Sequence, residues 1–206
     1  MARAAAPDSL LDRILATSTT LFAENGVDKT SMRMIAESLG VTKAALYYHV
    51  DNKDDLSHKI QERLIETVLE QLREIAESDQ DPAAKVRALV RHSLNSIADH
   101  RDAHTVLLRE VRHLDDPSWS GVAEMRTAYR RTVAEILSAG VEQGSFAIRD
   151  VDGATLALLG MCNWTYTWLD RSGKRSIDEL ADLFADVFLD GISKPAGRSA
   201  GSALAC

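Results

Sequence analysis

Proline and glycine are scarce in this chain of 206 residues, which holds four prolines and eleven glycines. Both residue types interrupt helices, so their scarcity leaves long segments in which a helix can continue. Ala, Leu, Glu, Asp and Arg dominate instead, and most of them favour helix. No alternating run of Val, Ile and Thr is bounded by turn residues, so strands are not expected. The sequence therefore predicts an all-α protein.

Cysteines and long apolar runs are also nearly absent. The two cysteines are Cys162, inside an apolar segment, and Cys206, the last residue. They form neither a disulfide framework nor a metal-binding spacing, which fits a reducing, cytoplasmic location. No run reaches about eighteen apolar residues, and the first residues lack the apolar core of a secretory signal. We therefore expect no membrane partner.

Sequence patterns of catalysis are missing as well. The chain has no nucleophile beside a base at a known spacing, no glycine-rich phosphate loop and no metal-binding helix motif. His100 and His104 are four residues apart and His113 is nine further on, but no third ligand has a fixed spacing. We expect neither an enzyme nor a cofactor nor a metal site.

The net charge of −7 and the pI near 5.4 argue against a protein that coats nucleic acid with its whole surface. The segment 29–53 differs from the rest, because it holds four cations and only the two anions Glu37 and Asp51. A small basic face is therefore expected here. Its cations are Lys29, Arg33, Lys43 and Lys53.

Three short amphipathic segments lie before and within this basic window. "PDSLLDRILATSTTLFAENG" predicts a helix that begins near Asp8 or Ser9 and ends at Gly26. "TSMRMIAESLG" predicts a second helix, capped by Thr30 or Ser31 and ended by Gly40. "VTKAALYYHV" then predicts a third, capped by Thr42. Two short helices joined by a turn that begins with glycine are a helix-turn-helix pattern.

The third helix carries side chains suited to DNA. The N-terminal end of such a helix enters the major groove, where Thr42 and Lys43 can reach base edges and Ala44 a thymine methyl. Tyr47, Tyr48 and His49 follow one turn later, within reach of phosphates, and Lys53 begins the next helix. The alternative is that the tyrosines only pack against the core. The capping residues, the Gly40 turn and the cation excess favour DNA.

The stretch "LFAENGVDKTSMRMIAESLGVTKAALYYHVDNKDDL" resembles the DNA-binding domain of the TetR/AcrR family of bacterial regulators. The resemblance covers roughly residues 9–56, and only Val50 departs from a frequent Phe. It implies a homodimer on palindromic double-stranded operator DNA, released by a small inducer. The matching positions are Phe22, Gly26, Ile35, Ala36, Gly40, Val41, Leu46, Tyr47, Tyr48, His49, Val50, Lys53 and Leu56. Those implied to touch DNA are Ser31, Arg33, Thr42, Lys43, Ala44, Tyr47, Tyr48, His49 and Lys53.

The remainder of the chain predicts further helices, about nine in all. We expect a helix-turn-helix domain over residues 1–56, a ligand-binding and dimerisation domain over 57–192, and a disordered Gly/Ser/Ala-rich tail over 193–206. The last two long helices, over 151–170 and 176–191, are expected to form a four-helix bundle with a second copy. The expected dimer contacts are Leu158, Ile177, Leu180, Phe184 and Phe188.

The segment "NWTYTWLDRSG" places several aromatic residues in an apolar helix. They can pack the core and the dimer interface, or line a ligand pocket. This part resembles TetR-type regulators of fatty-acid and steroid catabolism, which implies an acyl-CoA thioester as inducer. A repressor of an efflux gene that senses free hydrophobic compounds is the alternative, and most arginines can equally be solvated or paired. The candidate ligand residues are His104, Arg109, Arg112, Tyr129, Asn163, Trp164 and Trp168.

Overall fold

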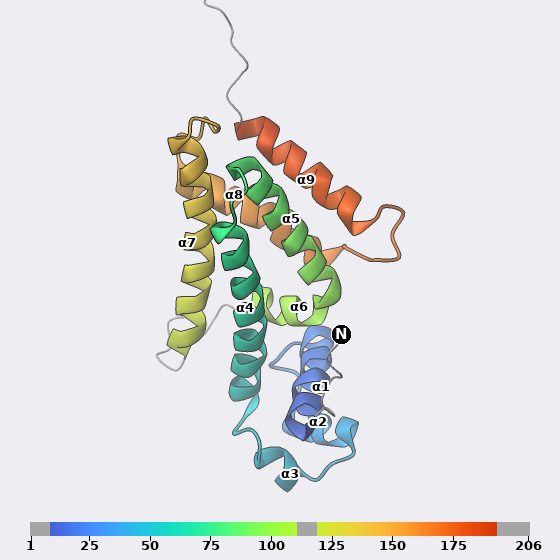
Figure 1. Cartoon of the computed structure of the whole chain (residues 1–206). Helices are drawn as coiled ribbons and strands as arrows, with labels where there is room; N and C mark the ends of the chain where they lie inside the picture. The colour runs from blue at the N-terminus through green and yellow to red at the C-terminus, as the bar shows by residue number, and fades with distance from the viewer. Residues whose placement is uncertain (1–8, 111–118, 193–206) are drawn as a thin grey trace, which may run out of the picture.

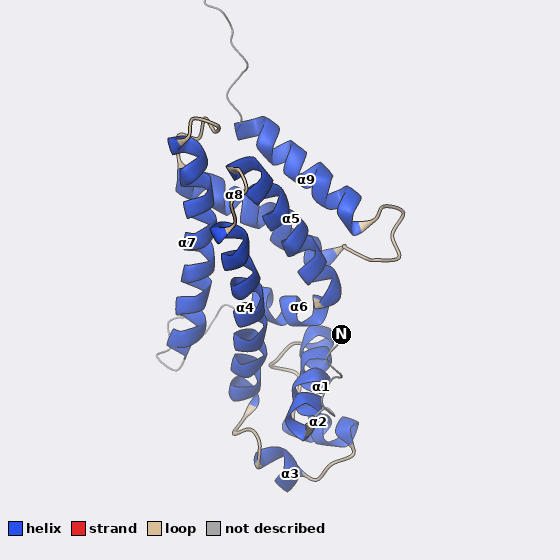
Figure 2. Ribbon diagram, viewed as in Figure 1, coloured by secondary structure: helices blue, strands red, loops and turns tan. Residues whose placement is uncertain are grey.

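The structure, a computed structural model, describes residues 9–110 and 119–192. In these ranges the chain folds into α-helices and one short 3-10 helix, without a β-strand, as predicted (Figures 1 and 2). The helices are α1 (Leu10–Asn25), α2 (Met32–Leu39), α3 (Lys43–Tyr47), α4 (Lys53–Glu77), α5 (Pro82–Asp99), α6 (Arg101–Arg109), α7 (Ser120–Glu142), α8 (Val151–Trp164), η2 (Thr165–Thr167) and α9 (Ile177–Ile192).

The first three helices, which we call the head, begin and end at residues that the sequence indicates. Ser9 caps α1 in a capping box with Asp12, and Ser31 caps α2. Gly40 follows α2 with φ +66°, a left-handed conformation that glycine adopts without strain. Thr30, the alternative cap, is instead buried, and its hydroxyl bonds to the Gly26 carbonyl at 2.9 Å.

Helix α4 is shared by the head and the larger C-terminal helical domain (Figure 1). Leu56 and Ile60 at its start belong to the apolar core of the head. Leu64, Ile65 and Val68 belong to a middle cluster, and Leu72 to the main core of the C-terminal domain. One helix thus runs through three apolar clusters, so a displacement at one end is transmitted to the other.

Helix α6 forms a second link between the same two parts. Val106 is buried in the core of the head, whereas its neighbour Leu107 belongs to the middle cluster. Ala103 packs against both clusters. The sequence indicated this helix but not its contact with α1.

The last apolar helix is shorter than predicted. The sequence predicted a helix over 151–170, but α8 ends at Trp164 and continues only as the short 3-10 helix η2. The Thr165 hydroxyl donates to the Cys162 carbonyl at 2.7 Å, and Trp168 N–H bonds to the Thr165 carbonyl in the tighter i+3 pattern. Among the described helices, none is both long and apolar enough to cross a membrane.

Candidate functional sites

Helix α3 presents its predicted DNA-contacting side chains to solvent. Leu46 is completely buried and anchors the helix in the core of the head. Tyr47 and Tyr48 are 50% and 85% exposed, so the alternative in which both pack against the core does not hold. Two exposed tyrosines beside an exposed Lys43 form a polar surface with aromatic faces.

Two of the candidate DNA contacts also hold the helix ends. Ser31 Oγ accepts from Met34 N–H at 3.2 Å, and Thr42 Oγ1 accepts from Ala45 N–H at 3.1 Å. A hydroxyl that accepts one bond still has its own hydrogen to donate. Both groups therefore keep a donor for a phosphate or a base edge.

The two cations at the edge of α3 have protein partners. Arg33 pairs with Glu37 one turn along α2 at 2.7 Å, and both side chains are exposed. Lys53 Nζ donates to the carbonyls of Val27 and Asp28, at 2.8 and 3.1 Å. Lys53 thus ties the start of α4 to the loop after α1, a role that the sequence did not indicate, and one of its three donors stays available.

His49 is half-buried at the end of α3. Its ring meets Tyr48 edge-on, with 5.1 Å between the ring centroids. Ala44 is exposed on the same short helix. The nine predicted DNA contacts therefore lie on α2, on α3 with the residues flanking it, and at the start of α4.

A cavity of about 210 Å³ lies in the C-terminal domain between helices α4 to α8. Its wall is mostly apolar, with a few polar side chains, as is usual for sites of small ligands. Of the candidate ligand residues, His104, Tyr129 and Asn163 line it, beside polar side chains that the sequence did not single out. The lining residues are Ile65, Val68, His92, Ser93, Ser96, Ile97, His104, Leu107, Leu108, Arg126, Tyr129, Arg130, Leu159 and Asn163.

Two polar groups of the cavity wall are partnered within the protein. His104 Nε2 lies 3.0 Å from Ser96 Oγ, and burial lowers the pKa of His104 to about 4, so the imidazole is neutral at pH 7. The Tyr129 hydroxyl lies 3.4 Å from Ser93 Oγ, and burial raises the pKa of Tyr129 to about 12. Both side chains are therefore uncharged hydrogen-bonding groups.

Two further polar groups of the wall keep buried atoms without a partner. Arg126 donates from Nη2 to the Leu107 carbonyl at 2.7 Å, but its buried Nη1 has no hydrogen-bond partner. His92 Nε2 is likewise buried and unpartnered. Burial lowers the pKa of both side chains, because a charge is poorly solvated there.

Several predicted ligand residues lie elsewhere. Trp164 and Trp168 are 65% and 46% exposed and do not line the cavity. Arg109 is exposed too; it donates to the Ala23 carbonyl at 3.3 Å, and its guanidinium lies 5.9 Å from the centre of the Tyr166 ring. Arg112 falls in 111–118, outside the described residues, as does His113.

The predicted dimer contacts need a larger correction. Leu158 is fully buried in the core of the protomer, and Ile177 and Phe188 are almost completely covered, so these three predicted dimer contacts pack against the protomer's own core. Leu180 and Phe184 are half-buried. The large apolar residues of α8 and α9 that remain exposed are Leu156, Trp164, Leu183 and Val187.

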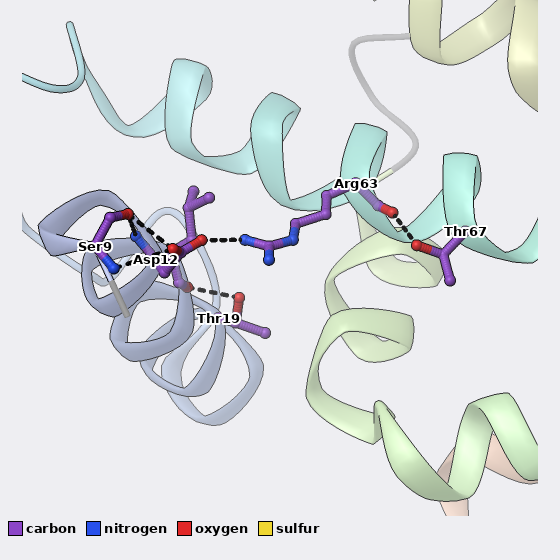
Figure 3. A network of polar contacts seen from close by, with 6 residues as sticks. Ser9, Asp12, Thr19, Arg63 and Thr67 are labelled. Atoms are coloured by element: carbon purple, nitrogen blue, oxygen red, sulfur yellow. Dashed lines mark hydrogen bonds and ion pairs between the residues drawn. The ribbon is translucent and has the colours of Figure 1, made fainter. Parts of the chain in front are cut away.

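The head and α4 are further joined by polar contacts (Figure 3). Arg63 of α4 reaches Asp12 of α1 at 2.6 Å, and the bonds from Arg63 and Ser9 lower the pKa of Asp12. Thr20 of α1 donates to Asp102 of α6 at 3.1 Å. An open groove of about 750 Å³ runs between these three helices.

Within the described ranges, no group of three or more His, Cys, Asp or Glu could hold a metal ion.

Comparison with known proteins identifies the family. Residues 14–60 match the family model for bacterial regulatory proteins of the tetR family, and residues 79–192 match that for the tetracyclin repressor-like C-terminal domain. The chain belongs to the TetR family. Its members are transcriptional regulators with a helix-turn-helix DNA-binding domain and a ligand-binding C-terminal domain.

Individual relatives extend this match over nearly the full chain. The HTH-type transcriptional repressor KstR2 of Rhodococcus jostii is 30% identical over 184 residues, or 88% of this chain and 90% of KstR2. The ketosteroid regulator KstR2 of Mycobacterium tuberculosis shares the fold, with a TM-score of 0.85 and 22% identity over 92% of this chain and 98% of that one. AibR, solved with isovaleryl coenzyme A and operator DNA, gives a TM-score of 0.78 at 25% identity, over 86% and 96%.

Proposed function

We propose that a homodimer of this chain represses transcription in the cytoplasm by binding a palindromic operator through α3, and that a small hydrophobic inducer releases it. The exposed polar surface of α3, held in place by the buried Leu46, carries this proposal. Lys43 and Thr42 would read the major groove, and Tyr47, Tyr48, His49 and Lys53 would contact phosphates. Ser31 and Arg33 would do so from α2, with Arg33 exchanging its bond to Glu37 for a phosphate.

The dimer would form through the exposed apolar residues of α8 and α9. Leu156, Trp164, Leu183 and Val187 leave large apolar side chains in water, which a second copy of the same two helices would cover. A two-fold axis at this surface would place two heads on one face of the DNA. Their half-sites would then be separated by roughly 34–36 Å, one turn of DNA.

Release would follow from the position of the cavity. Its wall includes His104 and Leu107 of α6 and Val68 of α4, the two helices that also pack into the head. A ligand that prefers one arrangement of these helices shifts the equilibrium only by its differential affinity for that state. A difference of about 2.7 kcal/mol would weaken operator binding roughly a hundredfold.

For the inducer, we favour a molecule with an acyl group, of which an acyl-CoA thioester is the first candidate. Arg126 and Arg130 lie one turn apart on α7 and both line the cavity, as an anionic ligand would require. AibR was solved with an acyl-CoA and DNA, which supports the same class. The scattered polar groups Ser93, Ser96 and Asn163 also suit free hydrophobic compounds, so an efflux-gene repressor stays the alternative.

The test is an operator shift with DNA from upstream of the chain's own gene, together with native mass spectrometry of the complex. We expect a dimer to shift this DNA, and a CoA thioester from a panel of lipid and steroid intermediates to release it. A shift that free hydrophobic compounds release, but no thioester does, would favour the efflux-gene alternative. If the pure dimer binds no palindrome in its own genome, the repressor function is wrong.

A further inference from the structure

Among the described residues, Arg126 has no counter-ion in a largely apolar wall. Its side chain is half-buried, its guanidinium makes one hydrogen bond within this part of the chain, to the Leu107 carbonyl, and Nη1 is buried without a partner. Burial lowers the pKa of Arg126. An unpaired buried charge is costly, and folded proteins keep such groups where a ligand completes them.

The geometry of the group selects the class of ligand. A guanidinium is a planar fork whose free edge matches the two oxygens of a carboxylate. Of the neighbouring polar groups, His104 is neutral and already bonded to Ser96, and the second arginine of the wall, Arg130, is exposed to solvent. His92 adds no donor for a carboxylate, because burial lowers its pKa and its ring hydrogen bonds to the Val68 backbone, which leaves Nε2 an acceptor.

The size of the cavity limits the rest of the ligand. An apolar protein cavity of about 150 Å³ holds benzene. The cavity here measures about 210 Å³, enough for a somewhat larger body. Apart from its few polar groups, the wall consists of Ile65, Val68, Ile97, Leu107, Leu108 and Leu159, which suits a compact hydrocarbon.

We infer that this cavity binds a compact carboxylic acid of roughly seven to ten non-hydrogen atoms, with its carboxylate on Arg126 Nη1 and its hydrocarbon body against the leucines and isoleucines. This inference goes beyond the acyl-CoA candidate, because a thioester has no free carboxylate, and it rests on the proposed function for any effect on transcription. It assigns the specificity of the site to Arg126, which the sequence analysis did not single out among the arginines.

Calorimetric titration of the full-length protein, without DNA, tests the inference. The probes are straight, branched and cyclic carboxylates of four to eight carbons, among them cyclohexanecarboxylate, each beside its primary amide of equal size. We expect at least one acid to bind roughly ten- to a hundredfold more tightly than its amide, because only the carboxylate neutralises Arg126. An amide that binds as tightly as its acid throughout the panel would overturn the inference.

Variants of Arg126 separate recognition from folding. Arg126→Met should reduce affinity for the best acid roughly ten- to a hundredfold and leave the melting temperature equal or higher, because an unpaired buried charge is removed. Arg126→Lys keeps the charge and should recover part of the affinity. Arg131→Met is the matched control: it lies on the same helix, is exposed, pairs with Glu135 and does not line this cavity. Unchanged acid binding by Arg126→Met would refute the assignment.

Operator binding distinguishes this inference from the proposed function. Arg126→Met should still shift the operator without ligand, and the acid should no longer release it. A protein that binds the operator but no carboxylate would remain a repressor with another inducer. A protein that binds the acid through Arg126 but no operator would retain the site and lose the proposed function.

Discussion

The surface of α3 and the cavity of the C-terminal domain hold their polar groups in opposite ways. On α3 the side chains are exposed, and the hydroxyls at the helix starts already bond to backbone N–H groups. In the cavity, the half-buried Arg126 and His92 each keep one buried atom without a partner. The polar groups of α3 are thus solvated or bonded, whereas two atoms of the cavity wall have no hydrogen-bond partner.

This difference predicts different responses to mutation. Removing a side chain from α3 should change binding and leave the fold intact, because water already solvates that side chain. Removing a polar group from the cavity should change stability and its pH dependence, because burial there is balanced against hydrogen bonds.

The largest expected effect comes from the apolar face of α8 and α9. Leu183→Asp with Val187→Asp should give folded monomers, measured by light scattering and circular dichroism. Operator affinity should fall at least a hundredfold, because two linked heads gain roughly that much from joint binding. As a control, Phe188→Asp should unfold the protomer, because that side chain is buried. A double variant that stays dimeric would place the interface elsewhere.

Substitutions on α3 should be next in size. Lys43→Ala and Tyr47→Ala should each cost about 1–3 kcal/mol of specific operator affinity, through lost contacts to bases or phosphates. Their melting temperatures should match the wild type, since both side chains are exposed. Fluorescence anisotropy with operator and scrambled DNA measures the effect. Equal losses on both DNAs would remove these residues from base readout.

The cavity should show itself in the pH dependence of stability. The pKa of His104 is lowered to about 4, against about 6.5 in an unfolded chain, so between these values the unfolded state binds the extra proton. Its contribution is fully present above pH 6.5 and is lost as the pH falls toward 4.

Lowering the pH from 7.5 to 5 should therefore cost about 2 kcal/mol of unfolding free energy through this group alone. Urea unfolding of the wild type and His104→Asn at both pH values measures this contribution. The variant should lose less stability than the wild type, while His49→Asn, outside the cavity, serves as the control. Equal losses in the wild type and His104→Asn would show that His104 is not held neutral by burial.

Lys53 is expected to affect both the stability of the protein and its affinity for DNA. Because its ammonium holds two carbonyls of the loop after α1, Lys53→Ala should lower stability by about 1 kcal/mol. If its third donor also meets a phosphate, the slope of log affinity against log salt should flatten by about one unit. Lys59→Ala, six residues further along α4 and paired with Asp55, is the control. A stability loss with an unchanged slope would leave Lys53 a purely structural tie.

The smallest effect is expected at the pair between α1 and α4. Asp12 and Arg63 are both exposed, so Asp12→Asn should change operator affinity by less than about threefold, and less still at high salt. Thermal unfolding and anisotropy at two salt concentrations measure this. A larger change would show that the angle between α1 and α4 depends on this bond.

The fold could be read from the sequence most completely in the head. The caps at Ser9, Ser31 and Thr42 and the glycine turn at Gly40 are set by residues three or four apart, so local chemistry decides them. The exposed tyrosines followed, because Leu46 alone fills the inward position of a helix of five residues.

The C-terminal domain was predicted less well, because the buried side of a helix there depends on distant partners. Leu158 of α8 and Ile177 and Phe188 of α9 are apolar residues that fit either a core or an interface, and only the packing of α8 and α9 within the protomer decides between the two. Arg126 likewise has no local feature that separates it from the exposed Arg130 and Arg131. Its burial depends on where α6 and α7 meet.

Because α4 is long, a small rotation about one of its ends causes a large displacement of the other end. A helix of its 25 residues is about 37 Å long at 1.5 Å per residue. Pivoting such a rod by only about 5° at its distal end moves the opposite end by about 3 Å, close to the rise of one base pair along the duplex. In a symmetric dimer the two displacements add. A rotation too small to disturb the packing around the pivot can therefore change the spacing of the two recognition helices so that they no longer fit the major groove.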